Sequence, residues 1–523
     1  MSALTNPVKI SSDAALADIG RRYVRAAVYS GFLGGVSQAL YGLTPLVVAR
    51  RLGPRDYGVY AVVMSLVAIV IGVFTLGQNS ALHKLIPQYY AQDRARGGSI
   101  LANVLILTAG LLAIFCAAFF WLSGWVAARL YHDAELTDVF RLSALLMLTL
   151  SLCGLAASVI AGLQDFKSYN LIQATRNLAL LILVWLGVLL LNLRGALWGQ
   201  LLAGLLGLGL LSFRGVKLVR ERFPEGLRLV FTRREFGVVA SFALPALALT
   251  LLNLPAYWWT NTLVARHAGF EQAGMFSVAF MLAQLIFLIP MSLYTPAMTF
   301  MSEAYAMSQD GSQDRSRDGS QAGFFTALVS ANLRAIWLFT LPLALGCALL
   351  APTLIKTLFG AAFMDAAPPT FALSFAALLM MLIGLINTAI TASGRVWSNC
   401  GIALGWTALF AIGGPIFIPR WGAAGAAALF AISYTLYLGA VCLYSHIALR
   451  VRYARLGRLV ALTMVSFALA AVILRANVGA AAYAAGAALC LCLIGVEWFW
   501  ICDRGERKQF RQRAARLLSN RGS

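Results

Sequence analysis

The chain has 523 residues, of which 60% are hydrophobic and only 12% are charged. Because about a quarter of the residues in soluble proteins are charged, this composition excludes a soluble protein and predicts an all-α membrane protein. The formal net charge of +21 would suit nucleic acid, but the placement of the basic residues indicates a membrane surface, with no nucleic-acid partner.

Fourteen apolar runs are long enough to cross a bilayer, which takes about 20 helical residues. Backbone amides find no partner in lipid, so each run is predicted to be a helix. The predicted spans are residues 29–49, 57–78, 99–121, 139–160, 171–192, 195–213, 237–262, 271–297, 329–350, 368–391, 397–418, 422–446, 457–475 and 478–501.

Lysine and arginine are distributed unevenly over the loops between these spans. With both termini inside, the inner segments carry about three times as many of these residues as the outer loops. This excess marks the cytoplasmic side of a membrane. We therefore predict a multi-pass protein of the cell inner membrane with both termini in the cytoplasm.

A stretch of 15 residues recurs along the chain. VARRLGPRDYGVYAV at 48–62 overlays VARHAGFEQAGMFSV at 264–278 with an offset of 216. Later matches have an offset of 230 and pair Ile160 with Ile390, Gly195 with Gly425, and Ala196 with Ala426. The polar segment 308–323, predicted to be a flexible insertion, explains the change of offset. The first twelve spans are thus predicted to be two copies of a six-span unit.

An even number of spans returns the chain to its starting side, so both copies have the same orientation and a site is expected between them. This arrangement is typical of a rocking, two-lobed transporter, and the alternative is a duplicated fold that no longer transports. The predicted domains are a cytoplasmic segment 1–28, an N-lobe 29–213, a cytoplasmic linker 214–236, a C-lobe 237–446, two further spans within 447–501, and a basic cytoplasmic tail 502–523.

The repeated stretch ends one helix and begins the next. Gly53 and Gly269 suit a left-handed C-cap, and Pro54 cannot continue a helix. A tight outer hairpin is the structural interpretation, and contact with an anion is the functional one. The residues of the first hairpin that bear on this choice are Arg50, Arg51, Gly53, Tyr57 and Gly58.

Polar side chains inside a bilayer are costly, so each indicates either a lumen or a contact between helices. Candidates for a substrate cavity occur in spans 1, 2, 7 and 8, which are equivalent pairs in the two copies. They are Gln38, Tyr41, Gln78, Asn79, Asn253, Tyr257, Asn261 and Gln284. Hydrogen bonding between helices, without a ligand, is the alternative for each.

Two arginines lie about one turn inside their spans, Arg176 in LIQATRNLALL and Arg334 in VSANLRAIWLF. Snorkelling to the inner surface is the structural alternative for both. The spans hold almost no acidic residues. A cavity with arginine and without carboxylates favours an anionic cargo such as a phosphate, which arginine binds through two parallel hydrogen bonds.

No sequence motif for ATP hydrolysis, metal binding or nucleophilic catalysis occurs in the chain. The glycine run GALWGQLLAGLLGLGLL at 195–211 lacks the ending of a phosphate loop and is interpreted as a close helix contact. We therefore expect no enzymatic activity, no cofactor and no metal. Energy for transport would come from a gradient or from the cargo.

Three stretches carry a resemblance to a known family: ARRLGPRDYGVYAVV at 49–63, LGQNSALHKLIPQYYAQ at 76–92 and AGLQDFKSYNLIQATRNLALL at 161–181. They are similar to the motifs of the polysaccharide transporter (Wzx-like) family in the multidrug/oligosaccharidyl-lipid/polysaccharide (MOP) flippase superfamily. The resemblance implies a MATE-like, V-shaped bundle of two six-helix lobes, here followed by two extra C-terminal helices.

The resemblance also implies a function, namely transfer of undecaprenyl-diphosphate-linked oligosaccharide, a precursor of O-antigen or exopolysaccharide, between the leaflets of the membrane. Its implied partners are the bilayer and the glycan polymerase and glycosyltransferases of the same pathway. The alternatives are a drug antiporter or lipid II flippase of the same superfamily and a non-transporting scaffold for glycan assembly. A membrane-bound polymerase or acyltransferase is disfavoured by the short outer loops.

Overall fold

The computed structural model describes residues 12–92, 94–163, 165–224, 233–287, 301, 318–451 and 456–476. Within these ranges the chain is almost entirely helical and has no strand, which confirms the predicted all-α fold. Nine helical segments of the described part are long and apolar enough to cross a membrane, and four of them each carry two predicted spans. The span predicted at 478–501 lies outside the described residues, so the count of fourteen stays a prediction.

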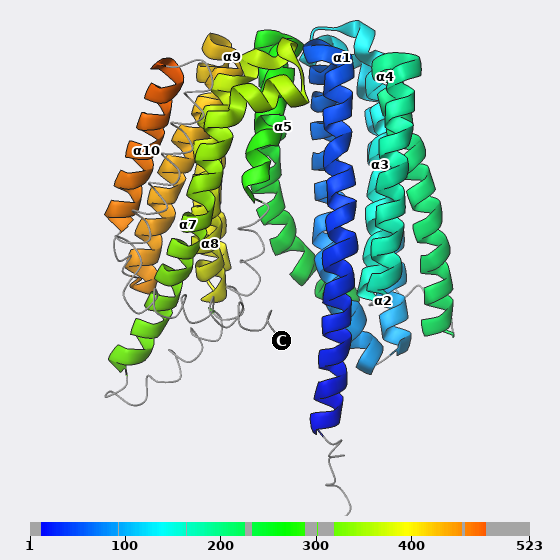
Figure 1. Ribbon diagram of the computed structural model, residues 1–523. Helices are drawn as coiled ribbons and strands as arrows, with labels where there is room; N and C mark the ends of the chain where they lie inside the picture. The colour runs from blue at the N-terminus through cyan, green and yellow to red at the C-terminus, as the bar shows by residue number, and fades with distance from the viewer. Residues whose placement is uncertain are drawn as a thin grey trace, which may run out of the picture. The chain divides into compact units, whose positions relative to one another are not determined.

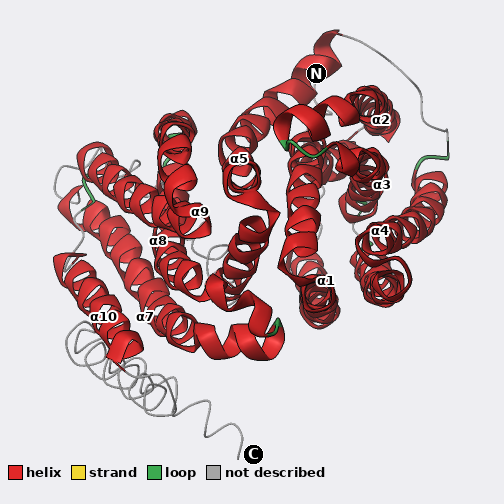
Figure 2. Ribbon diagram, turned by 90° about the horizontal axis from the view of Figure 1, so that it is seen from above, coloured by secondary structure: helices red, strands yellow, loops and turns green. Residues whose placement is uncertain are grey.

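The chain divides into two compact units, Met1–Leu52 with Val62–Leu254, and Gly53–Ala61 with Pro255–Ser523. Figure 1 labels the helices of both. The helices of the first unit are α1 (Ser12–Gln92), α2 (Arg94–Trp125), α3 (Thr137–Gly162), α4 (Phe166–Arg222) and the start of α5 (Arg233–Gln284). In this unit α3 packs against α2 on one side and α4 on the other, as the end-on view of Figure 2 shows.

The second unit takes in the remainder of α5, and its other helices follow in chain order. They are α7 (Asp318–Leu358), α8 (Ala367–Ala392), α9 (Val396–Leu449) and α10 (Leu456–Ala476). Here α8 packs against α7 and α9, and α10 packs against α7 (Figure 2). Residues 318–323 of the predicted flexible insertion form the start of α7, whereas 308–317 lie outside the described residues. The predicted bounds of the lobes and the linker stay predictions.

Short helical turns connect some of these helices. A π-helical turn, η1 (Val126–Leu130), and a 3₁₀ turn, η2 (Ala134–Leu136), connect α2 to α3. The 3₁₀ turn η3 (Leu285–Phe287) follows α5, and η5 (Ala361–Ala366) connects α7 to α8. The turns η1 and η2 therefore join α2 to α3, and η5 joins α7 to α8, with few residues.

The repeated glycines break α1 and α5 in the same way. Gly53 has φ 75° and ψ 177°, and Gly269 has φ 87° and ψ 166°. The predicted positive φ is present at both, but the predicted left-handed cap is wrong, because that conformation has ψ near +47°. The observed region, with ψ near 170°, is open essentially only to glycine.

A second pair of repeated glycines lies face to face inside the second unit. A Cβ atom on Gly58 would stand 1.7 Å from the Phe270 carbonyl oxygen, and one on Gly274 would stand 2.1 Å from the Pro54 carbonyl oxygen. Both approaches are to backbone, which cannot rotate away as a side chain can. The two copies of the repeated stretch therefore pack directly on each other.

The second offset of the repeat is visible in the helices themselves. Helices α3 and α8 begin 230 residues apart, as do α4 and α9. Helix α4 is interrupted at Asn192 (φ 49°, ψ −128°) and α9 at Gly422 (φ 53°, ψ −129°), again 230 residues apart. Each interruption folds a long helix into two antiparallel arms.

Close backbone contact holds the two arms of α4 together near Asn192. A Cβ atom on Gly195 would stand 1.8 Å from the Gly187 carbonyl oxygen. The equivalent Gly425 of α9 has the same relation to the Phe417 carbonyl oxygen, at 2.4 Å. This part of the glycine run therefore serves close helix packing, as the sequence predicts.

A polar latch joins the other ends of the two arms of α4. The Asp165 carboxylate accepts hydrogen bonds from the Ser168 backbone N–H (3.2 Å) and from Arg214 Nε (2.8 Å). Arg214 also donates to Ser168 Oγ at 3.2 Å. Burial raises the pKa of the Asp165 carboxyl, but the hydrogen bonds from Arg214 and Ser168 outweigh this and hold it below its ordinary value.

Candidate functional site

A cavity of about 510 Å³ lies within the first unit, between α1, α3 and α4. Its wall combines apolar residues with a set of amides, two phenols and one arginine. The polar members with these groups are Gln38, Tyr41, Tyr169, Asn170, Gln173, Arg176, Asn177 and Gln200. Three of the predicted candidates, Gln38, Tyr41 and Arg176, are therefore brought together in one cavity.

Arg176 is held on the cavity wall by its neighbour in α4. Its Nε and one terminal nitrogen donate to Asn177 Oδ1 at 3.3 and 3.2 Å. Asn177 is buried, and its Nδ2 donates to the Ser37 carbonyl oxygen (3.0 Å) and to Ser37 Oγ (2.9 Å) on α1. The guanidinium is thus linked through one amide to a different helix, rather than extended along its own.

Glycines give the arginine its space. The aliphatic stem of Arg176 lies over Gly207, where a Cβ atom would stand 2.5 Å from Arg176 Cδ. Gly204, one turn earlier, lines the cavity, and its carbonyl oxygen accepts a bond from the Cys153 thiol at 3.1 Å. A Cβ atom on Gly209 would meet nothing within 4 Å. Gly207, but not Gly209, is therefore needed to accommodate Arg176.

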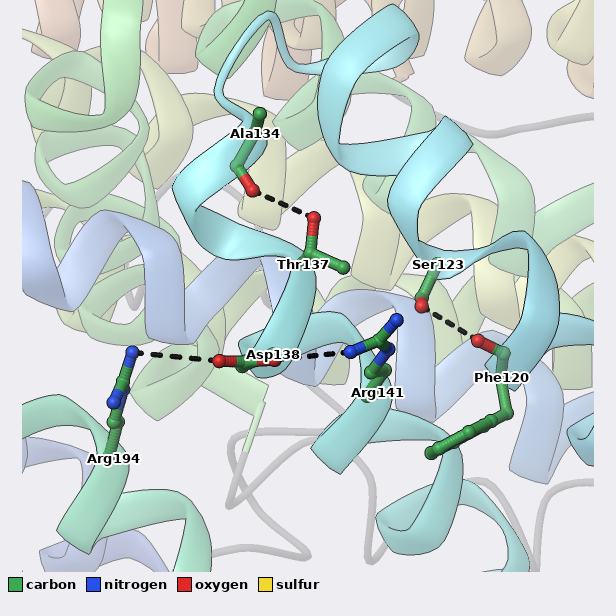
Figure 3. Close-up of polar contacts among 7 residues, drawn as sticks. All are labelled: Phe120, Ser123, Ala134, Thr137, Asp138, Arg141 and Arg194. Atoms are coloured by element: carbon green, nitrogen blue, oxygen red, sulfur yellow. Dashed lines mark hydrogen bonds and ion pairs between the residues drawn. The ribbon is translucent and has the colours of Figure 1, made fainter.

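Two other arginines of the first unit, Arg141 and Arg194, share an acidic partner, as Figure 3 shows. Asp138 at the start of α3 lies between Arg141 and Arg194, with nitrogen–oxygen distances of 3.5 and 3.9 Å. All three side chains are more than half exposed. Among the described residues no carboxylate pairs with Arg176. The cavity therefore carries an arginine whose charge is not balanced by a described acid.

The candidates of the second unit have different surroundings. Asn261 is fully buried, donates to the Tyr257 carbonyl oxygen at 3.2 Å and accepts a bond from Ser277 Oγ at 3.0 Å. The Tyr257 ring lies 4.3 Å from that of Phe280, centroid to centroid. These contacts match the alternative interpretation of hydrogen bonding and packing between helix segments.

The remaining predicted candidates are not among the described residues that line the cavity. Arg334 is half-buried on α7 in the second unit, and Gln284 is exposed at the end of α5. The side chains of Gln78, Asn79 and Asn253 lie outside the described residues. A cavity role for these five residues stays a prediction.

The residues of the first hairpin divide by position. Arg50 and Arg51 are exposed. Tyr57 is buried, with its ring stacked at 6.1 Å on Tyr60 and edge-on at 5.9 Å to Phe363 of η5. Gly58 makes the backbone contact described above. These contacts fit the hairpin interpretation, while anion contact by the two arginines stays untested.

At the equivalent positions of the second unit, aromatic side chains replace the polar wall. An offset of 230 takes Arg176 to Trp406, Gly204 to Tyr434 and Gly207 to Tyr437. The Trp406 ring stacks on Tyr434 at 5.3 Å and 14° and on Tyr437 at 5.8 Å and 25°. All three are buried. In the second unit, three aromatic rings therefore occupy the space that Arg176 occupies in the first unit.

Comparison with known proteins places the chain in a family. The polysaccharide biosynthesis protein family matches residues 47–368, which is more than half of the chain. The chain belongs to this family. The EPS I polysaccharide export inner membrane protein EpsE of Ralstonia solanacearum is 24% identical over 382 residues, covering 70% of this chain and 80% of EpsE. EpsE of Ralstonia nicotianae is 24% identical over 385 residues, with the same coverage.

Solved structures show the same fold. The lipid II flippase MurJ in its inward closed conformation has a TM-score of 0.69 at 13% identity, covering 91% of this chain and 98% of its own. An inward-facing multidrug resistance MATE family transporter of the MOP superfamily has a TM-score of 0.63 at 13% identity, covering 79% and 94%. The predicted MOP-type fold and the resemblance to a polysaccharide transporter family are therefore confirmed.

Proposed function

We propose that the protein is a flippase that moves an undecaprenyl-diphosphate-linked oligosaccharide from the inner to the outer leaflet of the cytoplasmic membrane. The observation that carries the proposal is the polar cavity with Arg176 inside a membrane-spanning unit of a polysaccharide biosynthesis protein. Polar groups within a membrane are costly and are typically kept for function. The cavity supports passage of a polar head group by alternating access.

The charge of the cavity supports this cargo over a cationic drug. Arg176 is the single charged side chain among the described lining residues, and none of them is Asp or Glu. A cation exporter would bind its cargo through carboxylates, whereas arginine repels it. A lipid II flippase would carry a different glycan on the same kind of carrier lipid. The family match favours a precursor of O-antigen or exopolysaccharide.

The proposal assigns no covalent step, because transfer between leaflets leaves the cargo unchanged. It places the protein in the inner membrane with both termini in the cytoplasm, as the distribution of basic residues indicates. Glycosyltransferases would supply the cargo on the inner side, and a glycan polymerase would consume it on the outer side. A scaffold for such an assembly would share these partners but would move no lipid.

The test is transport in proteoliposomes. The full chain is reconstituted with a fluorescent polyprenyl-diphosphate oligosaccharide, and accessibility of the label to an external quencher is followed over time. We expect movement by the wild type and a rate about tenfold or more lower for Arg176→Ala, because a hydrogen bond to a charged group contributes about 1.5–3 kcal/mol. Arg334→Ala, measured in parallel, reports on the second predicted arginine.

Arg194→Ala is the matched control, since Arg194 lies on the same helix, is exposed and pairs with an exposed carboxylate. Its transport rate should equal that of the wild type. Well-folded wild-type protein that moves no label would refute the flippase and favour the scaffold. Equal rates for Arg176→Ala and the wild type would leave the fold in place but remove the role of this cavity.

A further inference from the structure

We propose that the cavity of the first unit is a saccharide subsite, which holds a sugar of the cargo while the diphosphate binds outside it. The inference rests on the proposed function and goes further by assigning one part of the cargo to one cavity. Under this proposal the ligand of Arg176 is a sugar and not the phosphate that the sequence suggests. Three properties of the cavity support it.

The first property is the balance of hydrogen-bond donors and acceptors. Five amides and two phenols line the cavity, and each of these groups both donates and accepts. Sugar hydroxyls also donate and accept, so they match such a wall. A diphosphate only accepts, so it would use the N–H and O–H donors of the wall and leave the amide oxygens without a donor.

Gln173 makes this argument specific. It lines the cavity, and its Oε1 is buried with no hydrogen-bond partner among the described residues. An unpaired buried acceptor is destabilising and is satisfied only by a donor. A hydroxyl supplies that donor and a diphosphate does not.

The second property is the amount of positive charge. Arg176 is the single cation of the described wall, and two of its N–H groups are already given to Asn177 Oδ1. A diphosphate carries more than one negative charge, so part of its charge would stay unpaired in a site of low dielectric constant. One partly occupied arginine suits a hydroxyl or a ring oxygen, to which its remaining N–H groups can donate.

The third property is a fixed shape of suitable size. A cavity of about 510 Å³ falls within the range of small-molecule sites. Its wall is held in place, because Asn177 ties α4 to Ser37 of α1 and the Arg176 stem is seated over Gly207. In the second unit, Trp406 and two tyrosines occupy the equivalent positions. Such a subsite therefore belongs to the first copy of the repeat and not to the second.

The experiment measures binding directly on purified full-length protein in detergent. The probes are inorganic pyrophosphate and the oligosaccharide released by mild acid from the lipid-linked pool of the producing cell. Dissociation constants come from saturation-transfer NMR titrations. The variants are Gln38→Leu and Gln173→Leu, which remove an amide at nearly constant size, with Thr175→Val as control. Thr175 is exposed on α4, is not part of the wall and bonds to its own helix at the Leu171 carbonyl oxygen.

We expect the oligosaccharide to bind the wild type and Thr175→Val equally, and to bind each glutamine variant about tenfold more weakly. Pyrophosphate should not displace it. The proposal is overturned if pyrophosphate displaces the oligosaccharide from the wild type, if both glutamine variants bind like the wild type, or if the oligosaccharide does not bind.

Transport by the same preparations in proteoliposomes separates this inference from the proposed function. Transport without glutamine-dependent binding of the oligosaccharide refutes the saccharide subsite and leaves the flippase intact. Binding without transport refutes the flippase and leaves a carbohydrate site in the first unit.

Discussion

Helices α4 and α9 bend at equivalent positions, but the side chains packed beside their arms differ in kind. Their interruptions at Asn192 and Gly422 agree to within a few degrees in φ and ψ. The arms of α4 place Arg176 on a cavity wall with its stem over Gly207, whereas the equivalent positions of α9 hold a stack of three aromatic rings. The two copies therefore share their backbone bends and differ in the side chains of their interiors.

The difference shows how a cavity is opened in a repeated helical frame. At two positions the second unit has tyrosine where the first has glycine. At one of these glycines, Gly207, the stem of Arg176 takes the space of the missing side chain. Interiors are otherwise packed as densely as organic crystals. A polar cavity in one copy, matched by a filled core in the other, is therefore not imposed by the shared arrangement of helices.

The largest expected difference between the two units is tested by truncating the equivalent residues Trp406 and Arg176. Trp406→Ala should lower the free energy of unfolding by about 3–5 kcal/mol, because it leaves a large void among buried rings. Arg176→Ala should cost about 1 kcal/mol, since its side chain is half-buried beside a cavity. Unfolding in mixed micelles of SDS and a mild detergent measures both.

Trp397→Ala, at an exposed tryptophan of the same helix α9, is the control for Trp406 and should change stability by no more than about 0.5 kcal/mol. A comparable loss of stability at Arg176 and Trp406 would contradict the comparison, because it would make Arg176 a core residue.

A second prediction concerns Gly207, the glycine over which the Arg176 stem lies. Gly207→Ala should lower the transport rate about tenfold, because the new Cβ displaces the Arg176 stem, at a cost of about 1–3 kcal/mol in stability. Gly209→Ala, two residues away, adds the same methyl where nothing lies within 4 Å. Equal transport by the two variants in the proteoliposome assay would show that Gly207 does not position the arginine.

The smallest effect is expected at the polar latch of α4. Asp165→Asn removes the charge bound by Arg214, and the loss of stability should be about 1 kcal/mol, since asparagine keeps an oxygen that can accept from the Ser168 N–H. The pKa of Asp165 is lowered in the folded state. Its stabilisation is therefore complete above the ordinary Asp value of about 3.9 and is lost as pH falls through the lower folded-state pKa.

Unfolding midpoints of the wild type and Asp165→Asn, measured from about pH 7 down to pH 3, check this sign. The difference between them should shrink with falling pH. The second unit provides a contrast, because Arg395, Ser398 and Tyr444 occupy the positions of Asp165, Ser168 and Arg214, with Tyr444 bonded to Ser398. A difference that grows in acid would show that Asp165 is not stabilised as a carboxylate.

The helical frame could be predicted from the sequence because its signals are local. Long apolar runs define the helices, and two short matches at an offset of 230 anticipated the spacing of α3 and α8. For Gly53 and Gly269 the sequence predicted a positive φ correctly but not the value of ψ. Glycine has a further allowed region with extended ψ, and the sequence does not distinguish it from the helical cap.

The cavity could be predicted in part. Gln38, Tyr41 and Arg176 were recognisable because a polar group within an apolar run is conspicuous. Asn177 was missed because its role depends on Ser37, which is 140 residues away in the chain. The role of Gly207 was missed for a similar reason, since close packing and space for a side chain look alike in a glycine run.

The contact between the two copies of the hairpin has a further consequence. Gly58 approaches Phe270 and Gly274 approaches Pro54, and these two pairs exchange under the offset of 216. Reciprocity of this type characterises the isologous interface of a homodimer, where one patch binds itself. A single ancestral copy would have carried everything needed to pair with a twin. With both copies in one chain, that pairing does not depend on protein concentration.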